Sequence, residues 1–139
     1  MSVKGASNVI ALPGLEDGPI LVEPGEHLAV YMRHERPQAF KGLKLRVIFR
    51  LQDQRPVQLS RWYQVATSKG PIAAPACSDL VREMQAVLGR RVRHDRIPIS
   101  ALAGILVRVD VRTVTSDYRQ RTLALINQYS VIGRLEGKA

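Results

Sequence analysis

The chain is poor in cysteine and has no long apolar run. Cys77 is the only cysteine among 139 residues, so an internal disulfide is excluded. The most apolar stretch, residues 101–107, is far shorter than the roughly 20 residues that a membrane-spanning helix needs. The first 15 residues contain no continuous apolar segment of signal-peptide quality. These absences favour a protein of the reducing cytoplasm.

Catalytic and metal-binding signatures are also missing. The sequence contains no G-x-x-x-x-G-K-[ST], G-x-G-x-x-G, G-x-S-x-G or H-E-x-x-H. Its three histidines and one cysteine form no recognised ligand spacing. We therefore expect no enzymatic activity, no cofactor and no metal. A metal-dependent nuclease is the weakest alternative, because its acids would have to come from distant positions such as Asp53, Asp95, Asp110 and Asp117.

Negative charge is scarce, and this is the most informative property of the composition. The chain has 21 lysines and arginines against 12 acids, a net charge of +9, and 16 of the cations are arginine. Guanidinium groups match the geometry of phosphates better than ammonium groups do. Residues 1–26 carry a net charge of −3 and residues 27–139 carry +12. A basic body behind an acidic leader predicts a polyanionic partner, most often nucleic acid.

Alternation of apolar and polar residues predicts five strands, at residues 27–33, 43–52, 57–65, 105–114 and within 123–135. In the first, Leu28, Val30 and Met32 are expected to face the core. The second and fourth have one apolar and one cationic face, and in the last Tyr129, Val131 and Leu135 share one face. Residues 1–26 are expected to form an extended, partly flexible leader, with one short strand near residues 20–22, before a single basic β-barrel domain at residues 27–139.

One helix is predicted between the third and fourth strands. Ser78 is a good N-cap, Asp79 lies in the first turn, and Gly89 suits the C-terminal end. Between them runs an apolar stripe of Leu80, Met84, Val87 and Leu88, which indicates packing against the core.

Five strands with one helix after the third resemble the OB-fold, a five-stranded Greek-key barrel. The resemblance covers about residues 27–135 and rests on element order, since no residue motif defines the family. In size, charge and order the chain looks like small single-stranded-DNA-binding proteins of phages and mobile elements. That resemblance implies a role in replication or recombination. The alternative is an α+β open sheet with one packed helix, which keeps the same strands.

Aromatic residues make up only 5% of the chain, and Trp62 is the only tryptophan. It shares the polar parity of its strand with Gln58, Ser60 and Gln64, so an exposed indole that stacks on bases is expected. The alternative is that Trp62 plugs the barrel end or packs under the leader, and Arg61 on the apolar parity leaves a reversed orientation open. The further stacking candidates are Tyr31, which is expected to point outward with Arg33, and Tyr63 and Phe40.

Cations gather at outward strand positions and in the connections between strands. Contacts of such groups with phosphates would position a nucleic-acid strand without reading its sequence, although arginines on strands also act as solubilising residues. The predicted nucleic-acid-binding cations are Arg33, Lys41, Lys44, Arg46, Arg50, Arg61, Arg90, Arg91, Arg93, Arg108, Arg112, Arg119 and Arg121.

The tetrapeptide Arg-His-acid-Arg occurs twice, at residues 33–36 and 93–96. Histidine beside a carboxylate is compatible with a nuclease or metal site. Adjacent residues of a strand point in opposite directions, however, so we interpret both copies as charged segments with local ion pairs.

The sequence therefore predicts a non-catalytic protein that binds nucleic acid, with single-stranded DNA favoured and RNA as an alternative. The competing hypothesis is a small basic adaptor or subunit that binds an acidic protein or belongs to a ribonucleoprotein. The acidic leader would in either case be an intramolecular mimic of the polyanion. A homo-oligomer is compatible with both hypotheses, because exposed edges of small barrels commonly pair.

Overall fold

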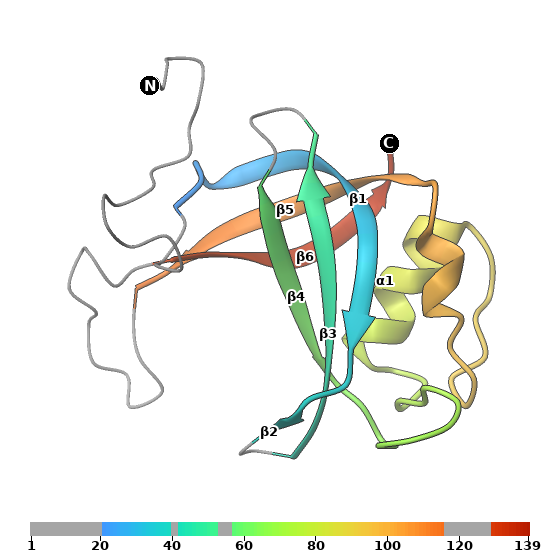
Figure 1. Cartoon of the computed structure of the whole chain (residues 1–139). Coiled ribbons are helices and arrows are strands. Elements are labelled where there is room, and N and C mark those ends of the chain that lie inside the picture. Colours follow the sequence, from blue (N-terminus) through green and yellow to red (C-terminus); the bar gives the residue numbers. More distant parts are fainter. Residues whose placement is uncertain (1–20, 40–41, 53–56, 116–128) are drawn as a thin grey trace.

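The computed structural model describes residues 21–39, 42–52, 57–115 and 129–139. The elements in chain order are the strands β1 (Gly25–Glu35), β2 (Gln38–Ala39), β3 (Gly42–Leu51) and β4 (Gln58–Gln64), the helix α1 (Asp79–Leu88), the 3-10 helix η1 (Ile99–Leu102), and the strands β5 (Leu106–Val114) and β6 (Tyr129–Lys138) (Figure 1). The described α-helix falls between the third and fourth long strands, as the sequence predicts. The short elements β2 and η1 were not predicted.

The long strands form one antiparallel sheet in the order β4-β3-β1-β5-β6. The first three are a meander, and β5 returns after the helix to lie beside β1, which is Greek-key order. The edge strands β4 and β6 contact each other, but no ladder of described residues joins them. The mainly β fold with one helix is confirmed, whereas the sheet is open and is not a closed, fully hydrogen-bonded barrel.

The core lies inside the curve of the sheet and is covered at one end by α1 (Figure 1). On β3, the alternating residues Leu45, Val47, Phe49 and Leu51 are all buried, and β5 contributes Val107, Val109 and Val111. Both patterns are as predicted, because each strand has one apolar face, and burial of that face in the core is favourable.

The helix begins and ends where its capping residues predict. The Ser78 hydroxyl accepts a hydrogen bond from the backbone N–H of Val81, and Gly89 adopts a left-handed conformation with φ of 69°. The buried apolar side chains of α1 are Leu80, Val81, Met84 and Val87. They pack the helix against β6 and β4, at the seam where the two sheet edges meet.

The predicted inward face of β1 is wrong. His27 and Ala29 are buried, Leu28 and Val30 are only half-buried, and Met32 is 40% exposed. One feature makes the buried histidine possible, and another changes the alternation further along β1. His27 Nε2 donates to the Glu23 carbonyl oxygen at 2.7 Å, which satisfies a polar group inside the protein. A register shift between Tyr31 and Arg33 then changes the alternation along the rest of the strand.

The predicted shared face of β6 is wrong in two of its three residues. Leu135 is buried, but Tyr129 is exposed and Val131 is half-buried, while Ser130 and Ile132 face the core. Register shifts in the β5–β6 ladder break the simple alternation of β6. Ser130 is satisfied in the interior because its hydroxyl bonds to the backbone of Val22 at both N–H and carbonyl.

The part of the leader that the structure describes packs onto the domain. Val22 is buried at 2% exposure next to Ser130, and an isolated bridge occurs at residue 21, near the predicted short strand. Residues 1–20 lie outside the described part of the chain. None of the described helices is long and apolar enough to cross a membrane.

Candidate nucleic-acid interface

Strands β1, β3 and β4 lie side by side in the sheet (Figure 1). Polar side chains of β3 and β4 lie on the face opposite the core. The register places Lys44 opposite Gln64, Arg46 opposite Trp62 and Arg50 opposite Gln58, and residues directly opposite one another point to the same side of a sheet. We call this surface the cationic face, made up of Arg33, Glu35, Lys44, Arg46, Arg50, Gln58, Ser60, Trp62 and Gln64.

Arg46 is the most connected residue of the cationic face. Its Cζ lies 5.6 Å from the centre of the Trp62 ring. Its Nε donates to the Ser60 hydroxyl at 2.7 Å, and a terminal nitrogen donates to the Glu35 carboxylate at 3.2 Å. Trp62 is 43% exposed, so the predicted outward orientation of the indole is confirmed. Arg46 is therefore held by Ser60 and Glu35 beside the exposed ring of Trp62.

A buried side chain lies beneath the polar groups of this surface. Ile48 has the outward parity of Arg46 and Arg50, yet it is only 2% exposed and does not belong to the main core cluster. Arg33 and Ser60 are its cross-strand neighbours. Ile48 is therefore a buried apolar residue with polar cross-strand neighbours on both sides.

Positive charge is in excess on the cationic face. Four cations and one carboxylate give a net charge of +3 (Arg33, Lys44, Arg46 and Arg50 against Glu35). Glu35 pairs with both Arg33 and Arg46, at 3.4 and 3.2 Å. Lys44 and Arg50 form no ion pair with any described residue. The ion pairs of the described residues therefore leave the charges of Lys44 and Arg50 unneutralised.

Tyr31 does not belong to this surface, so its predicted outward orientation is wrong. Its ring packs edge-to-face on the buried Phe49, with centroids 6.4 Å apart, and its hydroxyl bonds to His34 Nδ1 at 2.7 Å. Burial raises the pKa of Tyr31. Desolvation, followed by the charge of Arg36, lowers the pKa of His34. The register shift after Tyr31 separates its orientation from that of Arg33.

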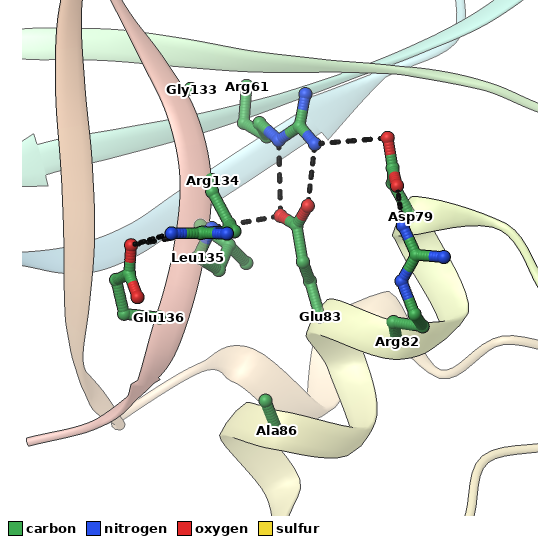
Figure 2. A pocket seen from close by; sticks show the side chains of 9 residues that line it. All are labelled: Arg61, Asp79, Arg82, Glu83, Ala86, Gly133, Arg134, Leu135 and Glu136. Carbon is green, nitrogen blue, oxygen red and sulfur yellow. Dashed lines mark hydrogen bonds and ion pairs between the residues drawn. The ribbon is translucent and has the colours of Figure 1, made fainter.

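Arg61 points away from the cationic face and into an ion pair with Glu83 of α1 (Figure 2). Its Nε and a terminal nitrogen donate to the two Glu83 oxygens at 3.1 and 2.6 Å. Glu83 Oε1 also accepts from the Tyr63 hydroxyl at 2.7 Å and from the Leu135 N–H at 2.9 Å. The Glu83 carboxylate therefore links α1 to both β4 and β6, the two edge strands that no ladder of described residues joins.

The electrostatics of this cluster follow from its burial. Desolvation lowers the pKa of the Arg61 guanidinium, but its hydrogen bond to Glu83 and the nearby anionic charges outweigh this effect and leave the pKa raised. Burial, and next the Glu83 charge, hold the pKa of Tyr63 well above its usual range. Tyr63 is only 4% exposed, so the prediction that it stacks on bases is wrong.

The other predicted cations that the structure describes do not converge on the cationic face. Arg108 and Arg112 point outward from β5, on the other side of β1 from β3, and Arg112 lies across Gly133. Arg90, Arg91 and Arg93 are exposed on the segment after α1, which pairs through His94 and Ile97 with residues 72–74. Phe40, Lys41, Arg119 and Arg121 lie outside the described residues, as do Asp53 and Asp117.

The two Arg-His-acid-Arg segments contain the local ion pairs that the sequence predicts. Arg33 pairs with Glu35 at 3.4 Å, and Arg93 pairs with Asp95 at 2.8 Å. The hydrogen bond from Arg93 lowers the pKa of Asp95. Among the residues that the structure describes, no three His, Cys, Asp or Glu side chains gather in a way that could hold a metal ion.

Sequence reasoning missed Glu83 and the contact of Glu35 with Arg46. A signal for Glu83 was present, because it interrupts the apolar stripe of the helix just as Arg61 interrupts the apolar parity of β4. Two misplaced charges of opposite sign in a small domain indicate a buried pair, since neither can be buried alone. Glu35 gave no such signal, because its contact with Arg46 depends on the β1–β3 register.

Comparison of the chain with protein-family models, with curated proteins and with solved structures finds no match.

Proposed function

We propose that the protein binds single-stranded nucleic acid non-catalytically through the cationic face, with Trp62 stacking on a base. The observation that carries this proposal is the exposed indole of Trp62, which lies directly opposite Arg46 and between Ser60 and Gln64 along β4. Single-stranded DNA is favoured over RNA. A role in replication or recombination of a mobile element fits the resemblance described above.

The spacing of the cations supports contact with several successive phosphates. Lys44, Arg46 and Arg50 lie along one strand, and a strand rises about 3.3 Å per residue, so the row is about 20 Å long. That length suits a few nucleotides, and OB-folds contact about 4–16 nucleotides. Phosphate contacts of this kind bind without reading the base sequence.

Stacking on Trp62 would distinguish an unpaired strand from a duplex. The bases of a duplex already stack on one another, whereas an unpaired base can place its ring against the indole. Such a contact contributes about 1–3 kcal/mol per base and tolerates any sequence. The proposal therefore combines a salt-dependent contact with the backbone and a salt-independent contact with a base.

A fluorescence titration tests the proposal, because Trp62 is the only tryptophan. A mixed-sequence single strand should quench its emission, and the logarithm of the binding constant should fall against the logarithm of salt with a slope of about −3 for four neutralised phosphates. Lys44→Gln and Arg50→Gln should each reduce that slope by about 0.7. Arg90→Gln and Arg91→Gln, away from the cationic face, are the controls. Absence of quenching and of salt dependence would overturn the proposal.

An adaptor that binds an acidic protein is the second candidate. The observation in its favour is that Met32 and Leu43, on the strands of the cationic face, are 40% and 36% exposed. Such a protein would purify with a stable partner and would show negligible affinity for free oligonucleotides.

A further inference from the structure

A cavity of about 420 Å³ adjoins the cationic face at Trp62. Lys44, Trp62 and Gln64 line it from the sheet, and Pro75, Cys77 and Leu80 line it from the segment that enters α1. We call it the Trp62 groove. It is continuous with the cationic face, because Lys44 and Trp62 belong to both.

The second wall of the groove is fixed by the fold. The N–H of Ser78 donates to the Pro75 carbonyl at 2.9 Å, and the N–H of Ala74 donates to the His94 carbonyl at 2.9 Å. Leu80 is buried at 1% exposure, which anchors the start of the helix. The groove is therefore formed before any ligand arrives, and binding would not have to order this segment.

The lining of the groove matches the chemistry of a single nucleobase. Trp62 and Pro75 offer exposed apolar surface to a flat ring, and the Gln64 amide can both donate and accept hydrogen bonds at the edge of a base. Lys44 has no ion pair within the described part of the chain and can contact a phosphate. The volume lies in the range of small-ligand sites, about 300–1,000 Å³, and is too small for a stacked duplex.

We infer that the Trp62 groove receives one unpaired base of a bound single strand, which passes from the cationic face around the edge of β4. This inference rests on the proposed function and names the part of the site that selects single strands. A base within a duplex must first be unpaired and unstacked to enter the groove, whereas an unpaired base enters directly.

The single cysteine of the chain gives a direct test, because Cys77 lines the groove and is exposed. A single-stranded DNA that carries a disulfide-activated thiol tether on one base should form a covalent adduct with Cys77. Excess unmodified single strand should suppress the adduct, whereas the same amount of duplex should not. A strand with the tether on its terminal phosphate is the matched control. Adduct formation that is equal for the two tethers and insensitive to competitor would overturn the inference.

A pair of substitutions gives an independent test through affinity. Cys77→Phe fills the groove and should weaken single-strand binding about tenfold, the loss of roughly one stacked base. Ala76→Phe adds the same bulk at the neighbouring exposed residue, which does not line the groove, and should change affinity by less than about twofold. Duplex binding should change by less than about twofold in both variants.

The outcomes separate failure of the inference from failure of the proposed function. If both phenylalanine variants bind single strands like the wild-type protein while Trp62→Ala binds weakly, the groove is not a base site and the cationic face remains the interface. If the wild-type protein binds neither single strand nor duplex, the function and the inference both fail. If Cys77→Phe does not fold, which circular dichroism would reveal, the cross-linking of the wild-type protein decides.

Discussion

The guanidinium of Arg46 lies over the indole of Trp62, 5.6 Å from the ring centre, from the directly opposite position on the neighbouring strand. The same side chain donates to Ser60 on β4 and to Glu35 on β1. One residue thus connects three strands and holds a positive charge beside an exposed aromatic ring. This arrangement needs a planar fork of donors, which arginine has and lysine lacks.

Arg46→Lys should therefore distinguish the effect of the positive charge on binding from the effect of the guanidinium contacts. The variant keeps the charge, so the salt dependence of single-strand binding should not change, but affinity should fall about fivefold because the guanidinium contacts are lost. Arg46→Gln should lose affinity and also reduce the salt slope by about 0.7. Arg50→Lys is the matched control, since Arg50 forms no ion pair with a described residue. Equal titrations for Arg46→Lys and wild type would contradict this role.

The Arg61–Glu83 pair should make a large contribution to stability. Glu83→Gln removes the nearer counter-charge of the largely buried Arg61 guanidinium and leaves only the exposed Asp79 at 3.9 Å. The substitution should lower the free energy of unfolding by about 3 kcal/mol, as measured by urea denaturation. In a double-mutant cycle with Arg61→Leu, the double variant should lose less stability than the sum of the two single losses, by about 1 kcal/mol or more. The exposed pair Arg82–Asp79 gives the comparison, because Arg82→Gln should cost less than about 1 kcal/mol. Additive losses at Arg61 and Glu83 would show that the pair is not coupled.

The raised pKa of Tyr63 predicts a loss of stability in alkali. Burial and the Glu83 charge make the folded protein hold the phenolic proton above pH 10.0, where the unfolded chain releases it. The contribution is therefore complete below that pH and declines above it, by up to about 1.4 kcal/mol per pH unit. Tyr63→Phe should flatten this decline in urea denaturation at about pH 9–11, whereas Tyr129→Phe, at an exposed position, should not. The same slope in Tyr63→Phe and wild type would refute the assignment.

Arg36 should hold the loop that follows β4. Its terminal nitrogens donate to the carbonyl of Gly70 at 2.6 Å and to the carbonyl and hydroxyl of Thr67 at 2.8 and 3.0 Å. Arg36→Gln should increase the rate of tryptic cleavage after the exposed Lys69 about tenfold, because the loss of these hydrogen bonds lowers the free energy of local opening by about 1–2 kcal/mol. Mass spectrometry of the fragments measures this rate. Arg33→Gln, which loses only an exposed ion pair, is the control, and an equal rate in both variants would contradict the role of Arg36.

Local patterns in the sequence were enough to predict some elements and not others. Strands β3 and β5 and helix α1 were predicted with the correct buried faces, because strict alternation and capping residues act within a few positions of the chain. The faces of β1 and β6 were predicted wrongly. At the start of β1, the buried His27 is satisfied by the carbonyl of Glu23, which lies outside the strand. Register shifts alter the later part of β1 and the alternation of β6, and such a shift depends on the partner strand as well as on the strand itself.

Some features of the candidate site could likewise be predicted from the sequence and others could not. The outward orientation of Trp62 and of the β3 cations follows from their parity, since the apolar residues between them must be buried. The partnership of Arg61 with Glu83 joins residues 22 positions apart, and the Trp62 groove joins β4 to the start of α1. For β3, β4 and β5, the sequence alone determined which side chains are exposed. Only the tertiary structure decided which exposed side chains meet, because packing of the helix against the open seam brings distant residues together.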